Sequence, residues 1–316
     1  MRIADRVTIT EVGPRDGLQS LGKWVPTEHK LAMIDTLVGA GIASIEATSF
    51  VHPKVVPQMA DAERLMSGVE RKPGVTYRAL VPNLKGAQRA VAARTDVLVA
   101  LITVSEEYSR KNQNRGVQDL VHNVHEILEV GRASGTRVDI AVGMAFFCPY
   151  EGPIAEDRVE ALFSQLIDLG GERFYVATTS GMADPAHVHR LCERLLSRWP
   201  QIELGIHLHN TNGMALANAL AAMDAGVRTF EGSICGLGGG IVMPHGMAVG
   251  NVPTEDLVHM FSEMGVHTGI DLTSMGDAAR KIGELLGVEP ASYVGRGYTK
   301  AQTLLMGQAT PRYHPA

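Results

Sequence analysis

The stretch IELGIHLHNTNG at residues 202–213 decides the fold class of this chain. It is a short run of strand-forming residues that ends in His207 and His209 and passes into a polar segment with a glycine, which is typical of a strand followed by a turn. Because the two histidines are two positions apart, their side chains would project from the same face of the strand. This is metal-ligand spacing, although a pair of hydrogen-bonded structural histidines is the alternative interpretation.

Seven further runs of this kind occur along the chain, and amphipathic stretches separate most of them. The eight runs lie near residues 7, 44, 75, 97, 138, 173, 202 and 228. Strand and helix therefore alternate in units of roughly thirty residues, which predicts parallel strands with right-handed crossovers. Eight such units favour an α/β fold of the closed (β/α)8 TIM barrel type. No linker divides the chain, so we expect a single domain over residues 1–316, with additional C-terminal helices from about residue 273.

The bulk composition excludes several classes of function. The chain has 316 residues and a formal net charge of -5, which gives no electrostatic footprint for nucleic acid. No apolar run approaches the roughly eighteen residues of a membrane span, so no membrane partner is expected. Three widely spaced cysteines argue against a disulfide framework, and the charged N-terminal stretch does not resemble a signal peptide. The expected location is therefore cytoplasmic.

The segment EVGPRDGLQS at residues 11–20 stands at the exit of the first predicted strand. In TIM barrels, active sites collect at the carboxyl ends of the strands, so Arg15 and Asp16 would face the same mouth as the histidines. Asp16 adds a hard oxygen ligand, Arg15 offers planar donors to a carboxylate or an enolate oxygen, and Gly17 permits a tight turn. A surface loop with a salt bridge is the alternative interpretation.

Two more polar residues are expected at this mouth. Glu46, on the second predicted strand, would point inward and hold Arg15 in place. Asn251 follows the glycine-rich loop at 236–251 and precedes a helix start, so an N-terminal cap competes with a ligand role. Oxygen and imidazole ligands with room for water suit Mg²⁺ or Mn²⁺ better than a closed zinc site. The expected metal ligands are Asp16, His207, His209 and Asn251. The glycine-rich loop fails the dinucleotide fingerprint, so no nicotinamide cofactor is expected.

Five motifs together resemble the 3-hydroxy-3-methylglutaryl-CoA lyase family, within the wider metal-dependent lyase and synthase barrels. They are EVGPRDGLQS, IEATSFVHPKVVPQMAD, HLHNTNGMALAN, GLGG and GNVPTEDLV, and they span nearly the whole chain. The resemblance implies retro-Claisen cleavage, in which a 3-hydroxyacyl-CoA with a distal carboxylate yields acetyl-CoA and a keto acid. It also implies a small-molecule acyl-CoA substrate and a homodimer.

The resemblance further implies roles for individual residues. Arg15 would stabilise the thioester enolate oxygen, and Asp16 or His207 would take the proton of the substrate hydroxyl. The segment SEEYSRKNQN at residues 105–114 resembles the loop of the family near the coenzyme. On that basis Lys111, Asn112 and Asn114 would contact CoA, although such a run is usually a solvated face.

Two departures from the family pattern bear on the substrate. Gly240 stands where the family has a cysteine after GLGG, and the loop up to Asn251 is about two residues longer by this comparison. Cys235 is not expected to replace that thiol, whereas His245 could act as an acid or close over the substrate. An ordinary exposed loop histidine is the alternative for His245. Thr178 occupies the place of a family acid.

These departures suggest a paralogue that cleaves a different 3-hydroxyacyl-CoA, such as citramalyl-CoA or a longer branched hydroxyglutaryl-CoA. Two other functions stay open at this point. One is a metal-dependent aldolase or condensing synthase that acts on a 2-keto acid. The other is a catalytically silent barrel that binds a CoA ester or a protein partner.

Overall fold

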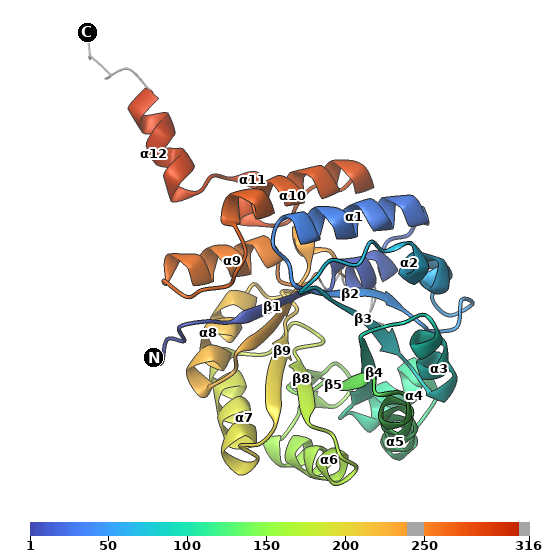
Figure 1. The fold of residues 1–316 in the computed structure, drawn as a ribbon. Helices are drawn as coiled ribbons and strands as arrows, with labels where there is room; N and C mark the ends of the chain where they lie inside the picture. The colour runs from blue at the N-terminus through green and yellow to red at the C-terminus, as the bar shows by residue number, and fades with distance from the viewer. Residues whose placement is uncertain (239–249, 310–316) are drawn as a thin grey trace.

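The computed structural model describes residues 1–238 and 250–309. Eight parallel strands close into a barrel, so each of the eight expected runs forms a strand and the predicted TIM barrel is confirmed (Figure 1). The barrel strands are β1 (Thr8–Glu11), β2 (Ser44–Ser49), β3 (Thr76–Val81), β4 (Val97–Thr103), β5 (Arg137–Gly143), β8 (Arg173–Ala177), β9 (Glu203–His207) and β10 (Thr229–Gly232). Their order around the barrel is β1-β10-β9-β8-β5-β4-β3-β2.

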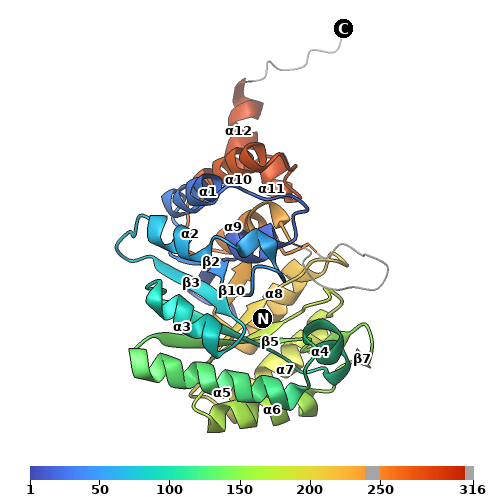
Figure 2. The same ribbon diagram turned by 90° about the vertical axis from the view of Figure 1, so that its right-hand side faces the viewer.

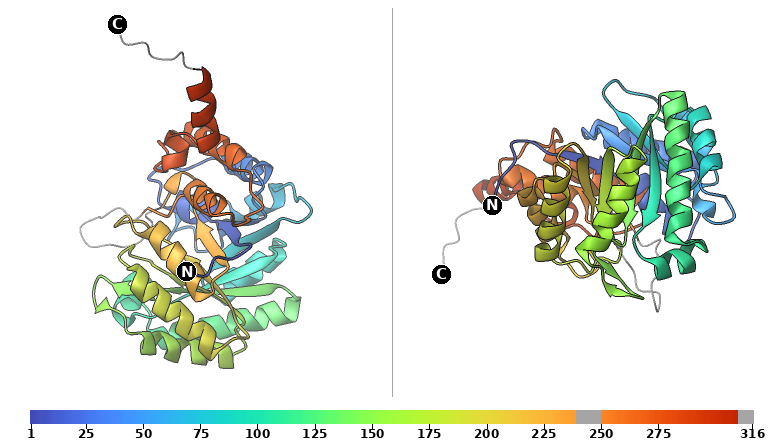
Figure 3. Two further views of the ribbon diagram at one scale, coloured as in Figure 1. Left: turned by 90° about the vertical axis from the view of Figure 1, so that its left-hand side faces the viewer. Right: turned by 90° about the horizontal axis from the view of Figure 1, so that it is seen from below.

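Helices surround the strands (Figure 1, Figure 2 and Figure 3). Helix α7 illustrates how the sequence sets them: the Asp184 side chain accepts a hydrogen bond from the backbone N–H of His187, and Pro185 occupies the first turn. Leu191 and Leu195, one turn apart, are buried on the inner face. The helices are α1 (Thr27–Gly39), α2 (Ala62–Gly68), α3 (Leu84–Ala92), α4 (Glu106–Gln113), α5 (Val117–Ser134), α6 (Glu156–Asp168), α7 (Pro185–Arg198), α8 (Ala215–Ala225) and α9 (Thr254–Glu263); a hairpin of β6 (Phe147–Cys148) and β7 (Gly152–Pro153) precedes α6.

Side chains alternate along each barrel strand between the helix layer and the lumen. The outward layer is apolar: Phe174 on β8 packs against Phe163 on α6 with ring centroids 4.7 Å apart. The lumen contains buried polar and charged side chains. They are Thr10, Glu46, Arg78, Asp139, Tyr175, His207 and Glu231. Branched apolar residues commonly fill this space in TIM barrels, so a charged layer here must supply its own partners.

The C-terminal helices expected from about residue 273 are present and begin one residue earlier. Helix α10 (Leu272–Leu286) lies outside the barrel against α1 and α9. After α11 (Tyr293–Arg296), helix α12 (Lys300–Ala309) projects away from the rest of the molecule and buries none of its residues (Figure 2). In the described part of the chain, no helix is long and apolar enough to cross a membrane.

Replacing Phe174 with alanine would remove the contact between β8 and α6 and leave a cavity. We expect the free energy of unfolding to fall by about 3–5 kcal/mol, measured by urea denaturation with an unchanged m-value. Tyr293→Ala is the control, because Tyr293 is 78% exposed and its removal should change stability by no more than about 0.5 kcal/mol. A Phe174→Ala protein as stable as the wild type would show that this contact does not hold α6 on the barrel.

Candidate metal centre and active site

A buried turn after β1 carries Arg15 and Asp16 into the mouth of the barrel. This π-helical turn spans Gly13–Gly17, and all five of its residues are buried. Gly17 ends this turn, as expected, although its φ is not positive. A Cβ on Gly17 would lie 2.8 Å from the Cβ of Leu237, so close approach of the neighbouring loop requires glycine there.

The two histidines enter from the end of β9. His207 is the last residue of the strand, whereas His209 lies beyond it and forms an isolated antiparallel bridge with Asn251. The expectation that both histidines belong to the strand is therefore wrong for His209. Their side chains nevertheless meet, because His207 Nε2 lies 3.1 Å from His209 Nε2.

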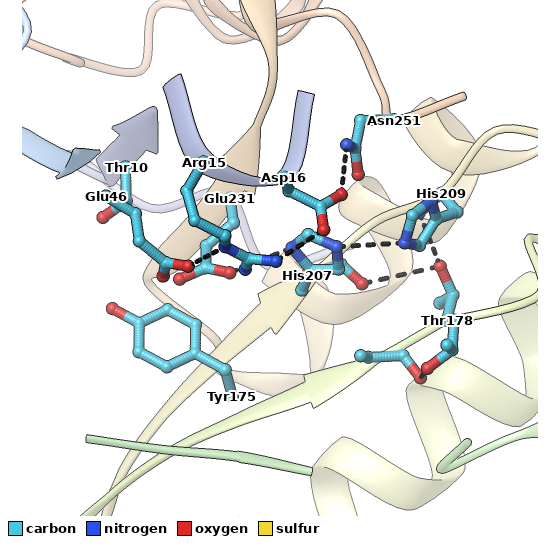
Figure 4. Close-up of polar contacts among 12 residues, drawn as sticks. Thr10, Arg15, Asp16, Glu46, Tyr175, Thr178, His207, His209, Glu231 and Asn251 are labelled. Atoms are coloured by element: carbon cyan, nitrogen blue, oxygen red, sulfur yellow. Dashed lines mark hydrogen bonds and ion pairs between the residues drawn. The ribbon is translucent and has the colours of Figure 1, made fainter. Parts of the chain in front are cut away.

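Asp16, His207 and His209 form a buried cluster whose potential ligand atoms all lie within 4.8 Å of one another (Figure 4). The structure thus brings together one carboxylate and two imidazoles from two separated segments. This arrangement can hold a divalent cation. The imidazoles lie next to the carboxylate, as the metal site expected from the sequence requires.

Asn251 completes the set of four expected ligands. Its side-chain N–H group donates to Asp16 Oδ2 at 2.7 Å and to the carbonyl oxygen of Leu237 at 2.8 Å. The amide Oδ1 is buried and accepts no hydrogen bond from the described residues. A buried acceptor left without a partner is costly, and a cation would satisfy it. The capping alternative is wrong, because Pro253 is the N-cap of α9.

Arg15 lies between two carboxylates. Its guanidinium pairs with Glu46 through Nε and with Asp16 through Nη1, the latter at 2.5 Å (Figure 4). Glu46 thus has the contact expected of it. Burial alone would raise the pKa of Asp16, but Arg15 and His207 outweigh burial and hold that pKa below its ordinary range. Asp16 is therefore ionised and suited to bind a cation.

Thr178, in the place of the family acid, contacts backbone. Its hydroxyl oxygen accepts a hydrogen bond of 2.9 Å from the backbone N–H of His209, and it is buried. The threonine therefore ties the segment after β9 to the end of β8. It presents no charge to the barrel mouth.

Sequence reasoning missed two charged residues beneath the cluster. Glu231 on β10 lies 2.9 Å from His207 Nδ1, and Arg78 on β3 lies 2.9 Å from Glu231. Each is the single charged residue of its strand, TYRALV in β3 or TFEG in β10. A lone charge in a strand could have indicated these residues, because a charge in the middle of a buried strand needs a partner.

The remaining expected residues are not among the three clustered side chains, and two of them lie outside the described ranges. Lys111 and Asn112 are exposed on α4, which follows β4, and Asn114 is the exposed C-cap of that helix. Cys235 is buried with its thiol donating to the carbonyl oxygen of Ala279, and burial raises the pKa of that thiol. This agrees with the expectation that Cys235 is no substitute for a reactive thiol. Gly240 and His245 belong to residues 239–249, outside the described residues.

The sequence profile of the HMGL-like family matches residues 6–282. The chain belongs to this family. It is 39% identical over 296 residues to the mitochondrial hydroxymethylglutaryl-CoA lyase of Bos taurus, an alignment that covers 93% of this chain and 90% of the relative. It is 37% identical to the hydroxymethylglutaryl-CoA lyase of Bacillus subtilis strain 168, with 89% and 94% covered.

A solved structure shows the same arrangement over the whole chain. This structure is an HMG-CoA lyase from Acinetobacter baumannii in complex with coenzyme A and 3-methylmalate. It is 36% identical to this chain, with a TM-score of 0.89 and coverage of 100% of this chain and 99% of the other. The HMGL-like barrel is therefore conserved between them from end to end.

Two further carboxyl groups support the turns around the site. Glu11 accepts hydrogen bonds from the backbone N–H groups of Gly13 and Ile234, and Glu255 accepts one from the backbone N–H of Cys235. Burial raises the pKa of Glu11 to about 7 and that of Glu255 to about 8. Their ordinary pKa is 4.5, so both keep protons that the unfolded chain releases at lower pH.

This proton retention predicts a pH-dependent stability. As pH rises from 4.5 through about 8, the unfolded state has lost the Glu255 proton while the folded state keeps it, so the free energy of unfolding falls. The Glu255→Gln variant mimics the protonated form and should gain stability relative to the wild type between pH 5 and pH 8.5, measured by urea denaturation. Glu203→Gln is the control: the hydrogen bond with Arg173 lowers the pKa of Glu203, so its effect should be constant over this range. A constant difference for Glu255→Gln as well would contradict the prediction.

Proposed function

We propose that this protein is a divalent-metal-dependent carbon-carbon lyase that cleaves a 3-hydroxyacyl-CoA to acetyl-CoA and a keto acid. The observation that carries the proposal is the convergence of Asp16, His207 and His209 beside the Arg15 guanidinium. Membership of the HMGL-like family supports the reaction type, as do relatives named hydroxymethylglutaryl-CoA lyase. The coenzyme A bound in the related Acinetobacter structure supports a thioester substrate.

The donor set fits a hard divalent ion. Asp16, His207, His209 and the unsatisfied Oδ1 of Asn251 would hold it, and Mg²⁺ or Mn²⁺ suits these ligands better than Zn²⁺. When bound, such an ion would supply Lewis-acid chemistry that lowers the pKa of the substrate hydroxyl. The remaining steps depend on side chains of the protein.

Bond cleavage transfers one proton and one electron pair. Of the two candidate bases, Asp16 and His207, Asp16 takes the hydroxyl proton, because Nδ1 of His207 faces Glu231 and its Nε2 would hold the ion. The bond between C2 and C3 then breaks, and C3 becomes the carbonyl carbon of the keto acid. The electron pair moves onto the thioester, whose enolate oxygen gains negative charge. Arg15 is placed to stabilise that oxygen, because Glu46 and Asp16 fix its guanidinium plane.

The enolate then needs a proton at C2 to give acetyl-CoA. With Gly240 in place of the family cysteine, we propose His245 as the donor or as a group that closes over the substrate.

The proposed contacts of the coenzyme are Lys111, Asn112 and Asn114, since α4 follows the carboxyl end of β4. The Thr178 hydroxyl is hydrogen-bonded to the backbone of His209 and stands where the family has an acid. We therefore propose a substrate other than hydroxymethylglutaryl-CoA, such as citramalyl-CoA or a longer branched hydroxyglutaryl-CoA. We also propose a cytoplasmic homodimer of single-domain chains.

A cleavage screen tests the reaction. Purified protein with Mg²⁺ or Mn²⁺ is incubated with a panel of 3-hydroxyacyl-CoA esters, and mass spectrometry detects acetyl-CoA and the keto acid. We expect turnover that chelation abolishes and that the His207→Ala/His209→Ala variant lacks; the His245→Ala variant, run on the same panel, should be slowed. Pyruvate release from hydroxy-keto acids would favour the aldolase instead. A protein that binds no divalent ion and cleaves nothing would be the silent barrel.

Replacing Arg15 with methionine should lower kcat by a factor of about 10²–10³, because the charge on the enolate oxygen would lose its partner. Circular dichroism at the assay temperature checks that the variant is folded, since Glu46 loses a buried partner as well. Arg110→Met is the matched control: Arg110 is an exposed residue of α4 that pairs with Glu106. A kcat of Arg15→Met within threefold of the control would remove Arg15 from the mechanism.

A further inference from the structure

A layer of charged side chains lies directly beneath the proposed metal centre. On one side of the lumen, Glu231 on β10 is the register partner of His207 on β9. On the other side, Glu46 on β2 is the register partner of Arg78 on β3. Strands β3 and β10 are not neighbours in the barrel, so a contact between Arg78 and Glu231 must cross the lumen.

The contact between Glu231 and His207 determines which imidazole nitrogen faces the cluster. Glu231 Oε2 lies 2.9 Å from His207 Nδ1 (Figure 4). An ionised carboxylate can only accept a hydrogen bond, so the proton of the neutral ring must be on Nδ1. The lone pair of Nε2 then points toward His209 and Asp16, where a metal ligand needs it.

Arg78 holds Glu231 in this position. Its Nη1 lies 2.9 Å from Glu231 Oε1, the carboxylate oxygen that does not face His207. The guanidinium stacks over the ring of Tyr175 at 4.6 Å, and its Nη2 lies 3.6 Å from Asp139 Oδ2. Arg78 is fully buried, so contacts on three other strands fix one position for its side chain.

We propose that Glu231 and Arg78 are positioning residues of the metal centre: Arg78 fixes Glu231, and Glu231 fixes the ring orientation and tautomer of His207. The inference rests on the proposed function for the identity of the ion. It does not depend on which thioester is cleaved. Neither residue touches the substrate in this scheme.

Metal binding is the direct test, with Mn²⁺ alone as the probe. Isothermal calorimetry on metal-free Glu231→Gln should show affinity for Mn²⁺ lowered about 10–100-fold, the usual loss when the hydrogen-bond partner of a ligating histidine is altered. Glu203→Gln is the matched control, because Glu203 pairs with the partly exposed Arg173 at the opposite end of β9 from His207. Its affinity should stay within twofold of the wild type.

Two further measurements test the role of Glu231 if Glu231→Gln fails to fold. Glu231→Asp keeps the charge opposite Arg78 but is one methylene shorter, so it should fold and still bind Mn²⁺ more weakly. Nitrogen NMR of the ¹⁵N-histidine-labelled wild type, free of metal and at an alkaline pH where the ring is neutral, reports the tautomer of His207 without any substitution. A ring with its proton on Nε2 would overturn the proposal, as would Mn²⁺ affinity within twofold of the wild type in the folded variant.

The contribution of Arg78 is tested separately. In Arg78→Lys, the ammonium keeps the charge but cannot contact Glu231, Asp139 and Tyr175 together, so a smaller loss of Mn²⁺ affinity than in Glu231→Gln is expected. Unchanged affinity would remove Arg78 from the proposal.

Failure of the proposed function gives a different result. If the wild type binds Mn²⁺ and the Glu231 variants bind it less tightly while no acyl-CoA is cleaved, the lyase is wrong and the positioning role stands. If turnover is found but the variants bind Mn²⁺ like the wild type, the lyase stands and the positioning role is wrong.

Discussion

The buried ion pairs in the barrel lumen are the constraint on which the site depends. Four buried carboxylates, Asp16, Glu46, Asp139 and Glu231, pair with the buried guanidinium groups of Arg15 and Arg78 and with the partly exposed Arg137, which leaves an excess of one negative charge if all are ionised. Charges removed from water are stable only when they are paired with good geometry. A divalent cation at the cluster would reverse that excess, and the anionic substrate proposed here would restore the balance. The electrostatics thus favour the ion and the substrate together.

Strand register makes this pairing possible. The helix layer, through contacts such as that of Phe174 on β8 with Phe163 on α6, holds the apolar face of the strand outward. A shift of one residue would turn every lumen side chain outward. The charged interior of the barrel therefore depends on its apolar exterior, because packing of the outward side chains keeps the charged side chains in the lumen.

The fold and the convergence of Asp16 with the two histidines could be predicted from the sequence, because the signals for both are local. Strand-forming runs identify the strands, and polar residues at strand exits identify Asp16 and His207. Arg78 and Glu231 were missed because a lone charge in a strand also fits a solvent-facing position, and only closure of the barrel brings the two together. The close approach that requires Gly17 likewise comes from Leu237, more than two hundred residues away in sequence.

The position of the acidic groups bears on the substrate. The hydroxyl oxygen of Thr178 accepts a hydrogen bond from the backbone N–H of His209, so the chain supplies no carboxylate at that position after β8. Glu231 lies instead below His207, whose ring we propose it orients, and it does not face the mouth. Negative charge is thus concentrated beneath the proposed metal centre, and at the mouth Arg15 presents a cation beside Asp16. A substrate with a distal carboxylate would meet less repulsion in this arrangement than beside an added acid, so the threonine is compatible with the proposed lyase chemistry.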